Sequence, residues 1–351
     1  MNPIESNPPR ATQLIVNLDQ IASNYHRIKS HSKRKLMAVL KANAYGHGLL
    51  AVAKRLEEEQ ADYFGVALLE EGLLLRKAGI QTPILVFGGF LVEQVEAFIQ
   101  QDITLTASSL DKLQAINHCA QSLGKKAVVH INVDTGMGRV GVQTRSAHKL
   151  LKEIVRCEWV NVEGIYSHFA RSDSLELEYS QLQLQRFESV LQTASDLGIS
   201  FLYKHLANSG GIVQMPDSYF DMVRAGILLY GVYPSVELIR TIDVHPALTW
   251  KTKVVYFKVL EAEQRVGYGS KWEAEELTRI VTLPVGYGDG YHRIMSEKAK
   301  VLINGRRQDV VGNICMDQIM VNIGWDSAFN GDEVVLLGQQ GQESISIEEL
   351  A

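Results

Sequence analysis

The sequence predicts an α/β protein in two parts: a (β/α)8 barrel of the TIM type, then a smaller domain made mostly of β-strands. Short apolar runs alternate with amphipathic helical patterns over residues 35–231, and the alternation repeats eight times. After about residue 240 the residue pattern changes to one typical of β-strands. Alternating strands and helices imply a parallel sheet, and eight units fit a closed barrel better than an open one. An open doubly wound sheet is the alternative.

The eight predicted strands are apolar runs separated by helical patterns. They are residues 36–40, 63–68, 83–88, 103–107, 127–133, 162–169, 202–207 and 223–231. Two of the helical patterns end at Gly124 and Gly198. Glycine is favoured just after a helix, because the chain often turns left-handed there. These two segments are therefore the best-bounded helices of the predicted barrel.

The predicted β domain is rich in β-branched and aromatic residues. Its strands lie within residues 247–260, 279–288, 300–312 and 318–324, and Asn304-Gly305 predicts a hairpin inside the third of these segments. We place the barrel at residues 1–240 and the β domain at 241–351, with the N-terminal segment as a candidate to pack with the β domain. We expect the β domain to be truncated at its C-terminus.

Composition narrows the class of protein. The 351 residues are 46% hydrophobic and 21% charged, as in globular proteins. A formal net charge of −5 without a long basic run favours neither nucleic acid nor a membrane surface as partner, and no apolar stretch approaches the roughly 20 residues that span a bilayer. Cys119, Cys157 and Cys315 lie far apart, which fits a reducing cytoplasm and predicts no metal site.

Polar residues follow, end or belong to several of the predicted strands, and we expect them at the end of the barrel where active sites lie. They are Lys41, Asp134, Arg139, His168, Asn208, Ser209 and Arg224. Each alone has an ordinary explanation: a lone lysine is usually a solvated rim residue, and a lone histidine a hydrogen-bonded core residue. Their shared location at one face of one barrel predicts an active site.

The small residues near the last two strands indicate what binds there. Ser209, Gly210 and Gly211 follow the seventh strand, and Gly226 and Ile227 belong to the eighth. Barrel enzymes most often hold a phosphate at this place, on free backbone N–H groups. A phosphate opposite a lysine after the first strand suggests a phosphorylated aldehyde bound as a Schiff base, namely pyridoxal 5′-phosphate (PLP).

Nearly the whole chain resembles the alanine racemase family, PLP enzymes of fold type III. The resemblance rests on the segments VLKANAYGHG, VDTGMGRVG, YSHFA, ANSGG, VRAGILLYG, GYGSKW, PVGYGDG and VGNICMDQ. It implies racemisation of L- and D-alanine by proton transfer on two faces of Cα, supplying D-alanine for peptidoglycan. It also implies a cytoplasmic homodimer with shared active sites.

The resemblance implies a role for each site residue. Lys41 carries the cofactor and is one acid–base group, while Tyr268 from a partner subunit is the other. His168 contacts that tyrosine, and Arg224 lies behind His168 and faces the pyridine nitrogen. The implied cofactor-binding residues are Lys41, Tyr45, Arg139, His168, Asn208, Ser209, Arg224, Gly226 and Ile227. The implied substrate-binding residues are Arg139, Met316 and Asp317.

Two departures from the family pattern bear on activity. Many members carry a carbamylated lysine where this chain has Asn132, so Arg139 is expected to be braced differently, for example by a bound anion. The chain also stops before the last strands that the family usually has, which leaves open an inactive fragment and a preference for serine over alanine.

Other functions remain as alternatives. They are a serine or broad-specificity racemase, a non-catalytic PLP-binding protein and a fold-type III decarboxylase. Arg224 speaks against the decarboxylase, because those enzymes place a carboxylate against the pyridine nitrogen. The β-type sequence after residue 240 speaks against a simple PLP carrier, which needs no such domain.

Overall fold

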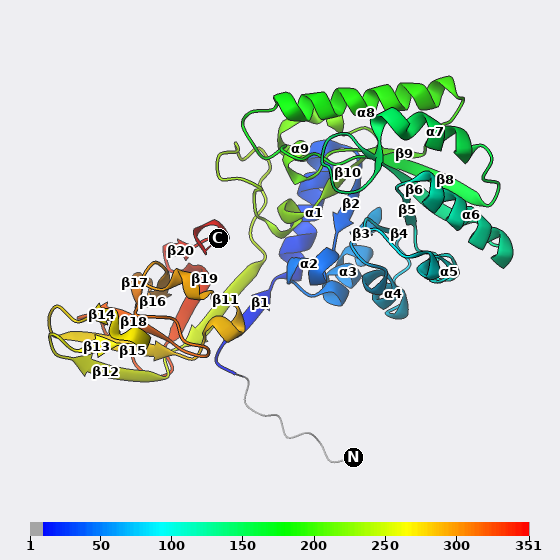
Figure 1. The fold of residues 1–351 in the computed structure, drawn as a ribbon. Helices are drawn as coiled ribbons and strands as arrows, with labels where there is room; N and C mark the ends of the chain where they lie inside the picture. The colour runs from blue at the N-terminus through cyan, green and yellow to red at the C-terminus, as the bar shows by residue number, and fades with distance from the viewer. Residues whose placement is uncertain (1–9, 351) are drawn as a thin grey trace, which may run out of the picture. The chain divides into compact units, whose positions relative to one another are not determined.

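A computed structural model of the protein describes residues 10–350. The chain divides into two compact units (Figure 1). Residues 18–247 form one unit, which we call the barrel unit. Residues 248–350 together with 10–17 form the other, which we call the β unit.

Eight parallel strands form the wall of the barrel unit. They are β2 (Lys35–Val39), β3 (Tyr63–Val66), β4 (Ile84–Val86), β5 (Leu105–Ala107), β6 (Ala127–Asp134), β8 (Val160–Tyr166), β9 (Tyr203–His205) and β10 (Met222–Ala225). They pair in the orders β10-β2-β3-β4 and β5-β6-β8-β9, and the short β7 (Val142–Gln143) adds to β6.

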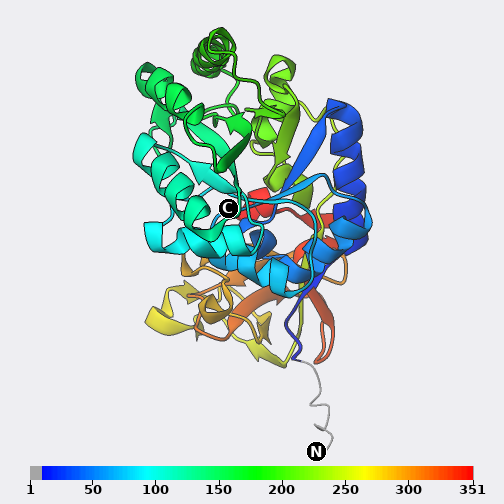
Figure 2. The same cartoon turned by 90° about the vertical axis from the view of Figure 1, so that its right-hand side faces the viewer.

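Main-chain hydrogen bonds join these two sheets at both edges. Between β4 and β5, Val86 donates to Thr104 over 3.1 Å. Between β9 and β10, Arg224 donates to Ala207 over 3.0 Å. The ring of strands is therefore closed, as Figure 2 shows with the helices outside it, and the closed-barrel prediction is confirmed over the open sheet.

Helices cover the outside of the barrel because each follows a strand and packs its apolar face onto the wall. The longer ones are α1 (Leu18–Ser32), α3 (Leu49–Glu58), α4 (Leu69–Lys77), α5 (Val95–Gln100), α6 (Leu110–Leu123), α7 (Thr144–Ile154), α8 (Glu178–Asp196) and α9 (Ser209–Gln214). Short turns of helix are α2 (Lys41–Tyr45), η1 (Val92–Gln94), η2 (Pro216–Ser218) and η3 (Ile227–Tyr230). Gly124 and Gly198 take the left-handed conformation expected after α6 and α8, with φ of 62° and 72°.

The eighth predicted strand was too long. It ends at Ala225, and Ile227–Tyr230 instead form a 3₁₀ turn. Leu228, Leu229 and Tyr230 are all buried, so an unbroken apolar run looked like a strand although it is a buried turn. The sixth predicted strand, residues 162–169, also shifts to Val160–Tyr166.

The β unit is built on a nine-stranded sheet with the order β1-β11-β19-β16-β17-β18-β15-β12, and β20 pairs with β19. These strands are β1 (Gln13–Val16), β11 (Leu248–Lys253), β12 (Tyr256–Leu260), β15 (Thr278–Leu283), β16 (Lys300–Ile303), β17 (Arg306–Val311), β18 (Ile319–Gly324), β19 (Glu333–Gln340) and β20 (Glu343–Ile345). Smaller elements are β13 (Arg265–Val266), β14 (Trp272–Glu273), η4 (Tyr268–Ser270), η5 (Tyr287–Asp289), η6 (Arg293–Met295) and α10 (Ile347–Leu350).

Two features expected from the sequence are present in the β unit. Asn304 and Gly305 join β16 to β17 with φ of 52° and 73°, the positive values that a type I′ hairpin requires. The N-terminal strand β1 pairs antiparallel with β11, so residues 13–16 do pack with the β domain.

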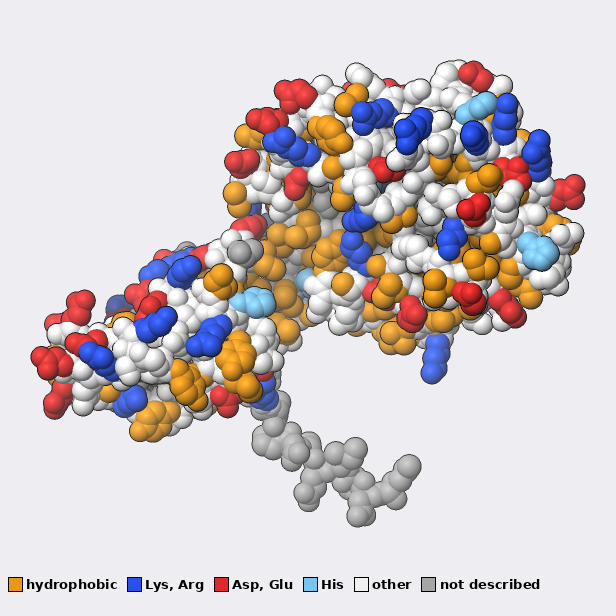
Figure 3. All heavy atoms as spheres, viewed as in Figure 1, with side chains coloured by type: hydrophobic (Ala, Val, Ile, Leu, Met, Phe, Trp, Pro, Cys, Tyr) orange, Lys and Arg blue, Asp and Glu red, His pale blue; other side chains and the backbone are white. Residues whose placement is uncertain are grey.

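On the face drawn in Figure 3, basic and acidic side chains are interspersed over the barrel unit. Within residues 10–350, no helix combines the length and the apolar character needed to cross a membrane.

Asn24 on α1 connects the first helix of the barrel unit to the segment after its last strand. Its buried amide donates to the carbonyls of Leu229 and His245 over 3.1 and 2.9 Å, and accepts from the His245 N–H over 3.0 Å. Because all three main-chain groups would lose their partner, we expect Asn24→Leu to lower the free energy of unfolding by about 2–4 kcal/mol.

Chemical denaturation of both proteins measures this loss. Gln121→Leu, at an exposed position on α6, is the control and should change stability by less than about 0.5 kcal/mol. Equal midpoints for Asn24→Leu and the control would show that Asn24 does not connect these segments.

Candidate active site

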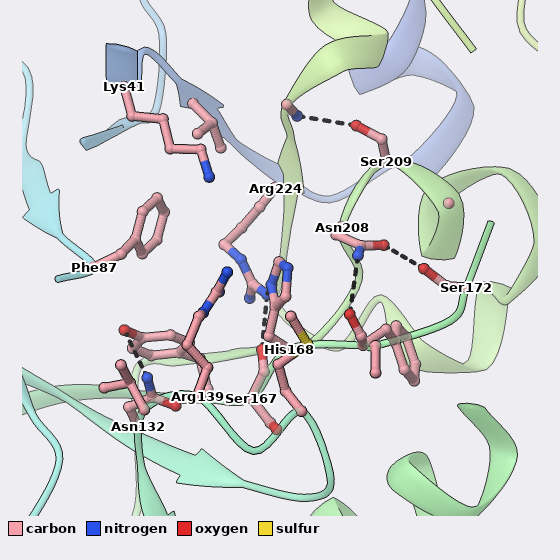
Figure 4. Close-up of a pocket in the computed structure, with 18 of the residues that line it drawn as sticks. Lys41, Phe87, Asn132, Arg139, Ser167, His168, Ser172, Asn208, Ser209 and Arg224 are labelled. Carbon is pink, nitrogen blue, oxygen red and sulfur yellow. Dashed lines mark hydrogen bonds between the residues drawn. The ribbon is translucent and has the colours of Figure 1, made fainter. Parts of the chain in front are cut away.

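A cavity of about 590 Å³ opens at the carboxyl ends of the barrel strands, and residues of the barrel unit line it. This size suits a small cofactor with its substrate. The cavity brings together every barrel residue that the resemblance selected: Lys41, Tyr45, Arg139, His168, Asn208, Ser209, Arg224, Gly226 and Ile227. Figure 4 shows the side chains of Lys41, Arg139, His168 and Arg224 converging there.

Lys41 follows β2 and is half-buried in the cavity. Burial lowers the pKa of its ammonium group, and the Arg139 guanidinium lowers it further. Glu71 acts in the opposite direction. A lower pKa increases the fraction of neutral amine, which is the form that attacks an aldehyde.

The chain after Lys41 makes a left-handed turn that the sequence did not predict. Ala42, Asn43, Ala44 and Tyr45 have φ between 53° and 55°, and each such residue costs roughly 1–2 kcal/mol. The turn is held by hydrogen bonds from Ala44 N to Leu40 O and from Gly46 N to Ala42 O, of 2.8 and 3.1 Å. Strain of this kind persists only where surrounding contacts enforce it, often at a functional site.

One corner of the cavity fits a phosphate. The Ser209 hydroxyl accepts from the Gly226 N–H over 3.0 Å, and the Tyr45 hydroxyl lies so close to Gly226 that a Cβ there would be 2.7 Å from it. Only glycine therefore lets Tyr45 reach this corner. Hydroxyl groups and main-chain N–H groups beside a lysine fit a phosphorylated aldehyde such as PLP.

Asn208 plays a structural part in the same corner. Its side-chain oxygen caps α9 by accepting from Gly211 N over 3.0 Å, and it also accepts from the Ser172 hydroxyl over 2.6 Å. Asn208 is therefore the N-cap of α9, and in this position it orients the Ser209 turn.

Arg224 is buried and its guanidinium makes several hydrogen bonds to neutral groups. It donates to Nδ1 of His205 and of His168 over 2.8 and 3.1 Å, and to the carbonyls of Ser167, His205 and Leu206. Among residues 10–350, no carboxylate pairs with it. Burial lowers its pKa to about 10, so Arg224 stays a cation at neutral pH.

Arg224 also determines the protonation of its histidine neighbours. Arginine only donates, so Nδ1 accepts in both His205 and His168, and each neutral ring carries its proton on Nε2. His205 then donates to His130 over 2.9 Å, and His130 donates to Glu163 over 3.1 Å. In the series Arg224, His205, His130, Glu163, each residue donates to the next. His168 makes no such further bond and keeps its Nε2–H for a group in the cavity.

Several residues of this network were not selected from the sequence. They are His205, His130, Glu163 and Tyr166. The Tyr166 ring stacks on His205 with centroids 4.9 Å apart, and the Arg224 guanidinium carbon lies 5.4 Å from its centre. The alternation of side chains along a strand could have identified His130. It is two residues from Asn132 on β6, so both side chains point to the same side of the barrel wall.

Asn132 makes no hydrogen bond to Arg139. Its amide donates to the Tyr166 hydroxyl over 3.2 Å. Arg139 instead lies exposed on the loop after β6 and lines the cavity. The Asp134 carboxylate shapes that loop by accepting from the N–H groups of Gly136 and Gly138 over 2.9 and 3.0 Å.

The remaining predicted residues lie in the β unit. Tyr268 on η4 and Met316 expose 72% and 61% of their surface, and Asp317 is also exposed. The Met316 loop is held by Gly288, whose N–H donates to the Met316 carbonyl over 2.8 Å. These side chains are thus available on the surface of the β unit.

The barrel, its cavity lysine and its phosphate corner define a PLP-dependent barrel enzyme. Residues 16–234 match the family model for the alanine racemase N-terminal domain, and residues 247–351 match the model for the C-terminal domain. The chain belongs to the alanine racemase family, whose enzymes use PLP. The resemblance found in the sequence and the predicted cofactor are therefore confirmed.

Relatives named as racemases match along most of their length. Alanine racemase 2 of Caldanaerobacter subterraneus subsp. tengcongensis is 40% identical over 97% of this chain and 89% of its own. A solved alanine racemase of Clostridium difficile 630 is 39% identical, covers 98% of this chain and 90% of its own, and gives a TM-score of 0.91. A histidine racemase of Leuconostoc mesenteroides is 30% identical, with coverages of 98% and 93% and a TM-score of 0.89.

The histidine network predicts how stability depends on pH. Burial lowers the pKa of His168 and His205 well below the usual value, and that of His130 to a lesser degree. In the unfolded chain all three take up protons below about pH 6.5, whereas the folded protein keeps them neutral. The free energy of unfolding should therefore fall as pH drops from 6.5, by up to about 1.4 kcal/mol per pH unit for each histidine.

Chemical denaturation between pH 6.5 and 5.5 measures this slope. In His205→Gln the amide oxygen can still accept from Arg224 while one titrating group is lost, so the contribution of the three histidines to the slope should shrink by about a third. Identical slopes for the two proteins would show that His205 is not held neutral.

Proposed function

We propose that this chain is an alanine racemase, interconverting L- and D-alanine with PLP and supplying D-alanine for peptidoglycan. The observation that carries the proposal is that one cavity holds both Lys41 and the buried Arg224, which no carboxylate among residues 10–350 pairs with. The three cysteines are unpaired, which supports a reducing compartment such as the cytoplasm.

PLP, when bound, withdraws electrons from the Cα of an attached amino acid and so makes its proton acidic. Lys41 would hold the cofactor aldehyde, Arg139 its phenolic oxygen and Arg224 its ring nitrogen. Because the Arg224 guanidinium stays charged, a ring nitrogen beside it is disfavoured from taking up a proton. This restrains the withdrawal of electrons and favours simple proton exchange over side reactions. Tyr45, Ser209, Gly226 and Ile227 would bind the phosphate.

Racemisation needs one acid–base group on each face of Cα. The Lys41 amine, with its lowered pKa, can take or return the proton on one face. We assign the other face to Tyr268 of the partner subunit in a homodimer. An ordinary tyrosine has a pKa near 10, but the Nε2–H of His168 can donate to its oxygen and stabilise the deprotonated form. Met316 and Asp317 of the partner subunit would meet the substrate carboxylate.

The substrate side chain is the less constrained part of the proposal. Relatives named alanine racemase at about 40% identity favour alanine. The similar fold of a histidine racemase supports a second candidate, a racemase that accepts serine or larger amino acids. The match of residues 247–351 to a racemase C-terminal domain disfavours a non-catalytic PLP-binding protein.

Exchange of the α-proton of L-alanine in deuterated water tests the reaction directly. Purified protein with PLP should form D-alanine and incorporate deuterium at Cα, whereas Lys41→Ala should do neither, because the cofactor anchor and one acid–base group are lost. NMR and chiral chromatography measure the two products. Running serine and histidine beside alanine ranks the substrates, and deuterium exchange without D-alanine formation would contradict racemisation.

Subunit mixing tests the shared site. Lys41→Ala and Tyr268→Phe should each be inactive alone, but a mixed dimer would hold one site with both residues intact. Random exchange gives about half mixed dimers, and so roughly a quarter of wild-type activity. Native mass spectrometry confirms that the dimers have mixed. Confirmed mixing without recovered activity would mean that the two residues act within one chain.

A further inference from the structure

Glu71 makes a contact that its position on α4 does not require. One oxygen of its carboxylate accepts from the N–H groups of Ala67 and Leu68 over 2.8 and 3.2 Å, which closes the first turn of the helix. The other oxygen accepts from the N–H of Ala42 over 2.6 Å. A single side chain therefore joins the carboxyl ends of two neighbouring strands, β2 and β3.

The contact with Ala42 falls on the first peptide after Lys41. The strand β2 ends at Val39, Leu40 N makes the last hydrogen bond to β3, and the first N–H groups of a helical turn have no partner inside the turn. The Ala42 nitrogen is bonded to the carbonyl carbon of Lys41, so holding this N–H fixes the direction in which the chain leaves the lysine. It also fixes the entry to the left-handed turn of residues 42–45.

The charge of Glu71 acts on the same lysine. Lys41 faces Arg139 from the loop after β6, Arg224 from β10 and the neutral His168 beyond β8. Both arginines disfavour a charged amine at Lys41, and Glu71 is the acidic side chain that opposes them. The hydrogen bond to Ala42 and the negative charge that acts on Lys41 therefore come from the same residue, Glu71.

We propose that Glu71 is a positioning residue for Lys41, holding the left-handed turn so that the amine stays in place in the cavity. The proposal rests on the proposed function, in which Lys41 anchors PLP. The competing explanation is that Glu71 only caps α4, as a carboxylate in the first turn of a helix commonly does. In that case its loss lowers stability but leaves the chemistry of Lys41 unchanged.

Capture of PLP by the cofactor-free protein separates these explanations. In Glu71→Gln one oxygen becomes an NH₂ group that cannot accept, so one end of the bridge fails and the charge is lost. Glu70→Gln is the matched control, because Glu70 lies in the same helical turn and is exposed. Absorbance reports the step in which the Lys41 amine condenses with the aldehyde and water leaves, without any substrate.

We expect Glu71→Gln to bind PLP roughly 10- to 100-fold more weakly, as for the loss of a hydrogen bond to a charged group. The pH midpoint of capture should also move down, because a negative charge beside Lys41 has gone. Hydrogen exchange of residues 42–46 should become faster in the cofactor-free protein. Glu70→Gln should match wild type within about twofold, since its carboxylate bridges no strands.

A second variant covers the case in which Glu71→Gln does not fold. Glu71→Asp keeps the charge but is one methylene too short to bridge both strands, so capture should weaken while its pH midpoint stays near that of wild type. Wild-type capture of PLP in a variant with reduced thermal stability would overturn the proposal and leave Glu71 as a cap. Because no racemisation is measured, failure here is distinct from failure of the proposed reaction.

Discussion

The hydrogen bonds from the buried Arg224 guanidinium to neutral acceptors are the interaction on which the rest of the site depends. Within the described residues, the Arg224 guanidinium bonds only to imidazole nitrogens and carbonyl oxygens. A nearby carboxylate would neutralise its charge and draw its donors away from the cavity. Because neutral acceptors surround it instead, the arginine keeps both its charge and its orientation, and it fixes the tautomers of His205 and His168 by donating to both.

The closed barrel lowers the free-energy cost of burying this hydrogen-bonded network. The network passes from β10 through β9 and β6 to β8, in the order Arg224, His205, His130, Glu163. Strands of one closed ring hold these side chains at hydrogen-bonding distance, and the contact between His205 and His130 spans from β9 to β6 past the intervening β8. After β2, the strand that pairs with β10, the strained turn that follows Lys41 is likewise held by contacts from several elements.

Local patterns in the sequence predicted the fold well, because each barrel strand is an apolar run beside a periodic helix. They failed where burial replaced alternation, as in Ile227–Tyr230, which form a turn although every residue is apolar. The cavity residues could be selected because they lie at the ends of predicted strands, as Lys41 and His168 do, or beside glycines, as Ser209 does. Tyr268, Met316 and Asp317 were selected through family resemblance alone, and their roles stay proposals.

The sequence by itself determined the two-part architecture and the family, and it selected Lys41 as the residue that we propose holds the cofactor. Those features are written in residues that lie close together along the chain. Only the tertiary structure decided which nitrogen of each histidine carries a proton, that Asn132 bonds to Tyr166, and that Glu71 reaches Ala42. His130 and His205 are 75 residues apart, and Ala42 and Glu71 are 29 apart. No local periodicity records such contacts, because they arise only when the closing barrel brings the strand ends together.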